Sequence, residues 1–95
     1  MENYAQYNNG KIPSLPQDLL QPFSHGWRQP TAEEVRLLLK IANLTGSQAA
    51  EIIGSNSRAI RRYTGGERAI HYAEWRLLLI YAGLVKPISI AQNQP

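Results

Sequence analysis

The sequence contains no cysteine and only two histidines, His25 and His71. Without cysteine the chain can form neither disulfide bonds nor thiolate metal sites, and it has no thiol nucleophile; this composition also suits a reducing compartment. The two histidines are far apart in the sequence, with no carboxylate at the spacing of metal ligands. We therefore expect no metal site and no cofactor.

Long apolar runs are absent too. No run reaches the length that spans a membrane, and the first residues, MENYAQYNNGK, have neither the basic start nor the apolar stretch of a signal peptide. Ser24 precedes His25, but nothing in the sequence orients the imidazole, and no other set of residues suggests nucleophilic or acid–base catalysis. The sequence thus predicts a soluble cytoplasmic protein that is not an enzyme and has no membrane partner.

Positive charge is concentrated in one part of the chain. The chain of 95 residues carries a net charge of +3, and the stretch from Gly54 to His71 alone has the same excess, with four arginines against Glu67. A basic patch on a small domain is typical of a surface that binds phosphates, but arginine is also common on solvated helix faces. Charge alone leaves both interpretations open. The four residues are Arg58, Arg61, Arg62 and Arg68.

Residues 1–30 differ in composition from the rest of the chain. They hold four of the six prolines, which interrupt any long helix. The stretch PQDLLQPF at 16–23 favours one helical turn. We expect residues 1–30 to form a largely irregular, flexible arm that lies over the domain, with the apolar anchors Leu19, Leu20, Phe23 and Trp27.

From Thr31 onward the pattern is helical, and we expect an all-α bundle of four or five short helices. Two capping boxes, TAEE from Thr31 and TGSQ from Thr45, mark helix starts, because the threonine and the Glu or Gln side chains satisfy backbone amides of the first turn. Apolar residues at helical spacing follow each box. The predicted helices span 32–43 and 46–53, and Gly54 ends the second.

Two further helices are predicted downstream. Either Asn56 or Ser55 caps a helix over 57–64, and after a loop containing two glycines another helix spans 72–83, with Gly83 at its end.

The domain that these helices form is placed at 31–86, followed by a polar tail at 87–95. Within the tail, PISIA alternates apolar and polar residues, so that Ile88 and Ile90 lie on one side as in a short strand.

The two helices over 46–53 and 57–64 have the residue spacing of a helix-turn-helix. Two steeply crossing helices need a small residue at their closest approach, a glycine in the turn and inward apolar residues at fixed offsets. Ala50, Gly54, Ile60 and Tyr63 meet this requirement. Together with the flanking helices, residues 31–84 resemble the Cro/cI-type (XRE-like) helix-turn-helix family of phage and plasmid repressors. The resemblance rests on Leu44-Thr45, Ala49-Ala50-Glu51-Ile52-Ile53-Gly54, Ser57 through Tyr63, and Gly66-Glu67-Arg68.

The resemblance implies that the chain binds double-stranded DNA. In such domains the helix corresponding to 57–64 lies in the major groove, and the helix corresponding to 46–53 crosses the backbone. Family members usually carry glutamine at the position of Gly46, where it braces the recognition helix, so Ser47 or Gln48 would substitute here. The residues expected to face the groove are Asn56, Ser57, Arg58, Arg61 and Arg62, and those expected to contact the backbone are Thr45, Ser47, Gln48 and Arg68.

The arginines differ in their expected roles. Arginine can bridge O6 and N7 of guanine with two hydrogen bonds, so Arg58 or Arg61 is the candidate for direct base readout. Arg62 lies further round the face and suits either a base or a phosphate.

These features predict a transcriptional regulator, a repressor that binds a palindromic operator as a homodimer. Surplus apolar surface on the first and fourth helices either forms the dimer contact or is covered by the arm, and Ile88 and Ile90 offer a strand for pairing across the dimer. Two alternatives remain. One is an antitoxin that represses its own operon and binds a toxin; the other is a helical protein-interaction module with no DNA role. The apolar residues in question are Leu37, Ile41, Leu77, Ile80, Tyr81 and Leu84.

Overall fold

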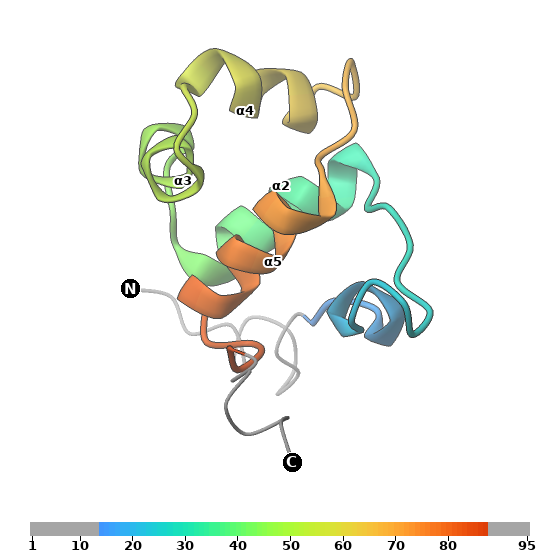
Figure 1. Cartoon of the computed structure of the whole chain (residues 1–95). Coiled ribbons are helices and arrows are strands. Elements are labelled where there is room, and N and C mark those ends of the chain that lie inside the picture. The colour runs from blue at the N-terminus through green and yellow to red at the C-terminus, as the bar shows by residue number, and fades with distance from the viewer. Residues whose placement is uncertain (1–13, 88–95) are drawn as a thin grey trace, which may run out of the picture.

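The computed structural model describes residues 14–87, and within that range the chain is helical and contains no strand (Figure 1). This confirms the expected all-α class with a helix-turn-helix. The strand expected at Ile88 and Ile90 lies outside the described residues. The elements are the 3₁₀ helix η1 (Gln17–Leu20) and the α-helices α2 (Ala32–Ala42), α3 (Gly46–Ile53), α4 (Ser57–Thr64) and α5 (Tyr72–Tyr81).

Both predicted capping boxes are present. At the start of α2 the hydroxyl of Thr31 accepts the Glu34 N–H at 3.2 Å, and the Glu34 carboxylate accepts the Thr31 N–H at 2.8 Å. At the start of α3 the side chains of Thr45 and Gln48 do the same, at 3.1 and 2.9 Å. Each pair satisfies amides that have no partner inside the helix, so the sequence marks these two helix starts locally.

Each of the four α-helices in the described range is followed within two residues by a left-handed residue. After α3, Gly54 has φ 71°, and Ser55 N–H donates back to Ala50 O at 2.8 Å. Glycine adopts this conformation without steric strain, and the backward hydrogen bond satisfies a carbonyl at the helix end. Helix α5 ends at Tyr81, two residues before the predicted end. Gly83, which was expected to end the helix, has a left-handed backbone but follows the last helical turn.

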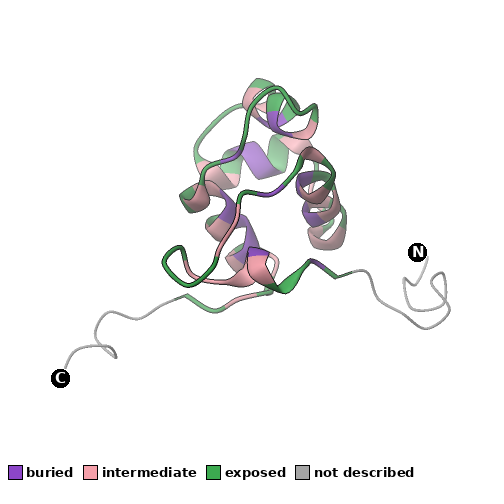
Figure 2. Cartoon of the chain, turned by 90° about the vertical axis from the view of Figure 1, so that its right-hand side faces the viewer, coloured by how far each residue is buried: buried purple, intermediate pink, exposed green. Residues whose placement is uncertain are grey.

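The core lies between α2 and α5, with α3 and α4 packed across them (Figures 1 and 2). Trp75, Leu78 and Leu79 of α5 are fully buried against Leu38 of α2. Burial of each such side chain stabilises the fold by roughly 1.5–3 kcal/mol. Helices α3 and α4 therefore rest on a common platform made by two other helices.

The segment before α2 packs on α5. Its Leu19, predicted as an anchor, is fully buried, and the predicted helical turn is η1. Trp75 Nε1 on α5 donates to Leu19 O, and an Arg76 guanidinium nitrogen donates to Leu20 O, both at 2.9 Å. Phe23 was also expected to be an anchor, but it is 65% exposed, because its ring packs on the rings of Trp27 and Tyr72 rather than in the core.

Arg28 ties this segment to the start of α2. Its Nε donates to Asp18 Oδ2 at 2.8 Å, and its two terminal nitrogens donate to the two carboxylate oxygens of Glu34 at 2.8 and 2.7 Å. The hydrogen bonds from Arg28 and from the Thr31 backbone lower the pKa of Glu34 to about 2. Glu34 therefore stays ionised, caps α2 and holds the preceding segment with one carboxylate.

Candidate nucleic-acid interface

Helix α4 has one buried and one cationic face. Ile60 and Tyr63 are 2% and 5% exposed, and the three arginines of the helix are exposed on the other side. With 3.6 residues per turn, Arg58 lies opposite the midpoint of these two core residues, and Arg61 and Arg62 flank it on either side. The local sequence thus turns all three cations outward, as predicted.

The two ends of α4 are fixed by specific contacts. Asn56 Oδ1 accepts the Ala59 N–H at 2.9 Å, so Asn56, and not Ser55, caps the helix. At the other end the guanidinium of Arg36 on α2 donates to the carbonyl of Thr64. A cation at a helix C-terminus is favoured by the helix dipole, so Arg36 stabilises the end of α4. The spacing of the sequence gave no sign of this contact.

Ser47 supplies the brace that was expected from Ser47 or Gln48. Its hydroxyl lies 3.2 Å from that of Ser57, which joins the first turns of α3 and α4. Gln48 is occupied in the capping box with Thr45. Gly46 lies beside Ile60, and a Cβ at Gly46 would meet Ile60 Cγ2 at 3.6 Å, an ordinary contact distance. The predicted contact residues of the two helices therefore meet at one exposed edge.

The charges on the outer face of α4 are largely uncompensated. Arg62 Nε lies 4.0 Å from Glu67 Oε1, a loose and exposed ion pair. Within residues 14–87, no carboxylate lies within ion-pairing distance of Arg58 or Arg61. The face therefore presents an excess of positive charge to solvent, which favours an anionic partner.

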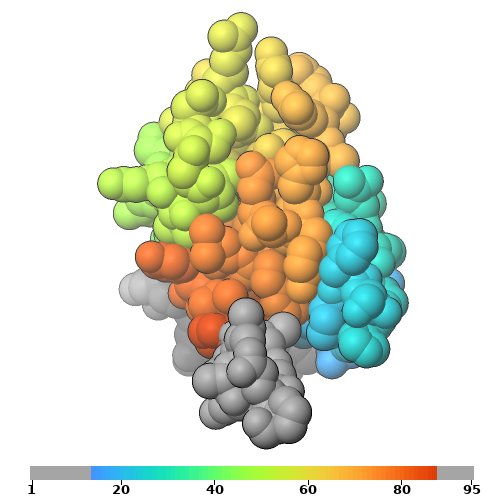
Figure 3. Space-filling view, viewed as in Figure 1, coloured from blue at the N-terminus to red at the C-terminus, as the bar shows by residue number. Residues whose placement is uncertain are grey.

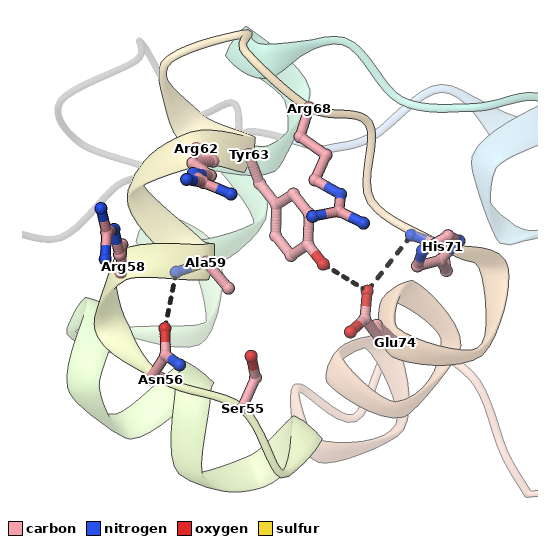
Figure 4. Close-up of a pocket in the computed structure, with 9 residues that line it drawn as sticks. All are labelled: Ser55, Asn56, Arg58, Ala59, Arg62, Tyr63, Arg68, His71 and Glu74. Atoms are coloured by element: carbon pink, nitrogen blue, oxygen red, sulfur yellow. Dashed lines mark hydrogen bonds between the residues drawn. The ribbon is translucent and has the colours of Figure 1, made fainter.

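An open hollow of about 410 Å³ lies between α4 and the first turn of α5 (Figure 4). Three arginines from α4 and the loop after it line the hollow, together with the Tyr63 hydroxyl, which donates to Glu74 Oε1 at 2.8 Å. Burial, together with this hydrogen bond, raises the pKa of Tyr63. Sequence reasoning missed the contact, since nothing in local spacing connects positions 63 and 74. The lining residues are Ser55, Asn56, Arg58, Ala59, Arg62, Tyr63, Arg68, His71 and Glu74.

Helix α5 has an apolar outer face. Leu77, Tyr81 and Leu84 follow at intervals of four and three residues and are 37%, 66% and 37% exposed, on the side opposite the buried Trp75 and Leu78. Figure 3 shows α5 at the surface between α3 and the segment before α2. Of the other residues expected in a dimer contact, Leu37 and Ile41 are partly buried against the core, and Ile80 is half-buried. Apolar side chains that are exposed side by side on one helix face gain by burial, so this face favours contact with a partner.

The described residues contain no group of three or more histidine or acidic side chains that could hold a metal ion. In the same part of the chain, no helix combines the length and the hydropathy that a membrane crossing requires.

Comparison with known proteins identifies the family. Two proteins of Escherichia coli, both named transcriptional repressor protein KorC, are 49% and 44% identical to the chain over alignments of 61 residues. Each alignment covers 61% of this chain and 72% of the relative. The chain belongs to the KorC family of transcriptional repressor proteins. No family model matches it. The KorC relatives support the predicted repressor class, while the resemblance to the Cro/cI-type family stays a prediction.

Proposed function

We propose that this KorC-family chain is a transcriptional repressor that binds double-stranded DNA with the outer face of α4. One observation carries the proposal: the second helix of a helix-turn-helix exposes Arg58, Arg61 and Arg62 opposite a buried face. The names of the KorC relatives support it, since a repressor of transcription must find its operator.

The geometry of α4 suggests which arginine reads a base. Arg58 lies at the centre of the outer face and has no carboxylate partner in the described range, so it is best placed to reach O6 and N7 of a guanine. Arg61 is the second candidate for base contact. Arg62 and Arg68 both line the hollow beside α4, where a phosphate of the DNA backbone fits their charge.

The first turns of α3 and α4 supply further phosphate contacts. Ser47 and Ser57 meet at this edge, and Thr45, Gln48 and Asn56 cap the two helices there. Exposed backbone amides at helix starts favour negative charge, because the helix dipole adds to their hydrogen bonds. We assign Thr45, Ser47 and Gln48 to backbone contacts that set the register of α4 in the major groove. Asn56 and Ser57 stay assigned to the groove-facing start of α4, where a phosphate also lies within reach of the helix amides.

The apolar face of α5 is the proposed homodimer contact. The segment before α2 covers Trp75 and Arg76 and leaves Leu77 and Tyr81 exposed, so it does not compete for this face. A two-fold dimer through α5 would present two copies of α4 to half-sites about one turn of DNA apart, on a palindromic operator.

Selection from a pool of random DNA duplexes tests the proposal. The wild-type chain should enrich an inverted repeat, with an affinity that falls steeply as salt increases. The triple variant Arg58→Ala, Arg61→Ala, Arg62→Ala should enrich nothing, and its folding should be checked by circular dichroism. If the wild-type chain binds no duplex, or binds without salt dependence, α4 belongs instead to a protein-interaction module and the proposal fails.

A further inference from the structure

Helices α4 and α5 each pack on α2 and α3, and they do not pack closely on one another. The hollow lined by arginines lies between them (Figure 4). A hydrogen bond crosses it, from Tyr63 Oη on α4 to Glu74 Oε1 on α5 at 2.8 Å. The relative position of the two helices therefore depends on their shared supports and on this direct link.

Both ends of the link are held in place. The Tyr63 ring is 5% exposed and packs in the core. Glu74 Oε1 also accepts the N–H of His71, the residue before α5, at 3.3 Å, which ties the carboxylate to the backbone of the first turn. Burial raises the pKa of Tyr63, so the hydroxyl keeps its proton and remains a donor. This hydrogen bond is partly buried, and hydrogen bonds to charged acceptors are among the stronger ones in proteins.

We propose that Tyr63 and Glu74 are positioning residues, which fix the DNA-reading face of α4 relative to the dimer face of α5 and so set the half-site spacing that the dimer accepts. The inference rests on the proposed function. In a two-fold dimer, the separation and tilt of the two reading helices follow from the angle between each reading helix and the dimer contact. A hydrogen bond between those two helices therefore influences the half-site spacing that the dimer accepts, although Tyr63 itself faces the core and not the DNA.

The variant Tyr63→Phe removes the hydroxyl and keeps the ring. Its matched control is Tyr72→Phe, because the Tyr72 ring packs on Phe23 and Trp27 and its hydroxyl has no hydrogen-bond partner within residues 14–87. Three kinds of duplex are compared: the operator enriched by the wild-type chain, the same operator with its spacer changed by one base pair, and an unrelated sequence. Tyr63→Phe should lose about tenfold in operator affinity and keep its affinity for the unrelated duplex. It should also discriminate less between the two spacings, while Tyr72→Phe behaves as wild type.

A second pair of variants tests the acceptor. Glu74→Gln keeps an oxygen that can accept from Tyr63 and His71, so it should retain the spacing preference. Glu74→Ala removes that oxygen and should match Tyr63→Phe. Thermal unfolding monitored by circular dichroism shows whether Tyr63→Phe folds. If it does not, the two Glu74 variants still test whether the hydrogen bond between Tyr63 and Glu74 sets the spacing preference.

The outcomes separate this inference from the proposed function. If the wild-type chain enriches no DNA sequence, the proposed function is contradicted. Alternatively, the wild-type chain prefers one spacing, and the Tyr63→Phe and Glu74→Ala variants keep the same preference. That result would contradict the positioning role and leave the proposed function intact. Equal losses on the operator and on the unrelated duplex would show that the link only stabilises the fold, and would also overturn the inference.

Discussion

Helices α4 and α5 are of similar length and rest on the same two helices, yet their outer faces are opposite in chemistry. The outer face of α4 carries three exposed arginines, whereas that of α5 carries Leu77 and Tyr81. A charged face is stable in water without a partner, and an apolar face gains by burial. This difference underlies the two proposed partners: an anionic polymer for α4 and a second copy of the chain for α5.

The largest effect should come from placing charge on the apolar face. Tyr81→Glu puts one carboxylate on each side of the proposed contact, so the dimer dissociation constant should rise about 100-fold. Sedimentation equilibrium measures the change. Phe23→Glu is the matched control, because Phe23 is an aromatic side chain with the same exposure, 65% against 66%, but lies outside α5. If both variants remain dimeric, α5 is not the contact.

Loss of the central arginine of α4 comes next. Arg58→Ala should cost about 1–3 kcal/mol on the operator and relax the choice of one base pair in each half-site. Competition binding with single-base operator variants measures both the loss of affinity and the relaxed base preference. Lys86→Ala removes the same charge from the segment after α5, at the end of the molecule away from α4 (Figure 1), and should have little effect. An equal loss on all sequences would make Arg58 a phosphate contact.

A phosphate contact beside α4 should give a smaller and less selective effect. Arg68→Ala should weaken binding to all duplexes by a similar factor and reduce the slope of log affinity against log salt by about 1. Titrations at several salt concentrations measure the slope. A slope equal to that of the wild-type chain would place Arg68 away from the DNA.

The brace between α3 and α4 should matter least. Ser47→Ala removes the hydroxyl that lies 3.2 Å from Ser57 at an exposed edge, so the loss in operator affinity should be about 0.5–1 kcal/mol. Ser24→Ala, which removes an exposed hydroxyl far from α4 in the sequence, serves as the control. An unchanged affinity would contradict the assignment of Ser47 as the brace.

Contacts between residues that are close in the sequence explain why many features of α2, α3 and α4 could be predicted. The capping boxes at Thr31 and Thr45, the glycine that ends α3 and the outward turn of the α4 arginines all follow from contacts within a few residues. Such contacts repeat across proteins, so a spacing predicts them.

Most of the hydrogen bonds that join separate elements were not predicted. The hydrogen bond from Tyr63 to Glu74, the contact of Arg36 with the end of α4 and the bonds from α5 to Leu19 and Leu20 all depend on tertiary packing. Periodicity gives the direction of a side chain from its own helix and not the element that it meets. For the same reason Phe23 was expected to be an anchor but lies mainly exposed.

A titration of isotope-labelled chain with its selected operator, followed by amide resonances, tests the central claim most directly. The account predicts that the largest shifts fall on residues 56–62 and on Arg68, while amides of the outer α5 face at 77–84 stay close to their positions in the free dimer. Large shifts on α5, with α4 unchanged, would contradict the assignment of the cationic face to DNA and of the apolar face to the second copy.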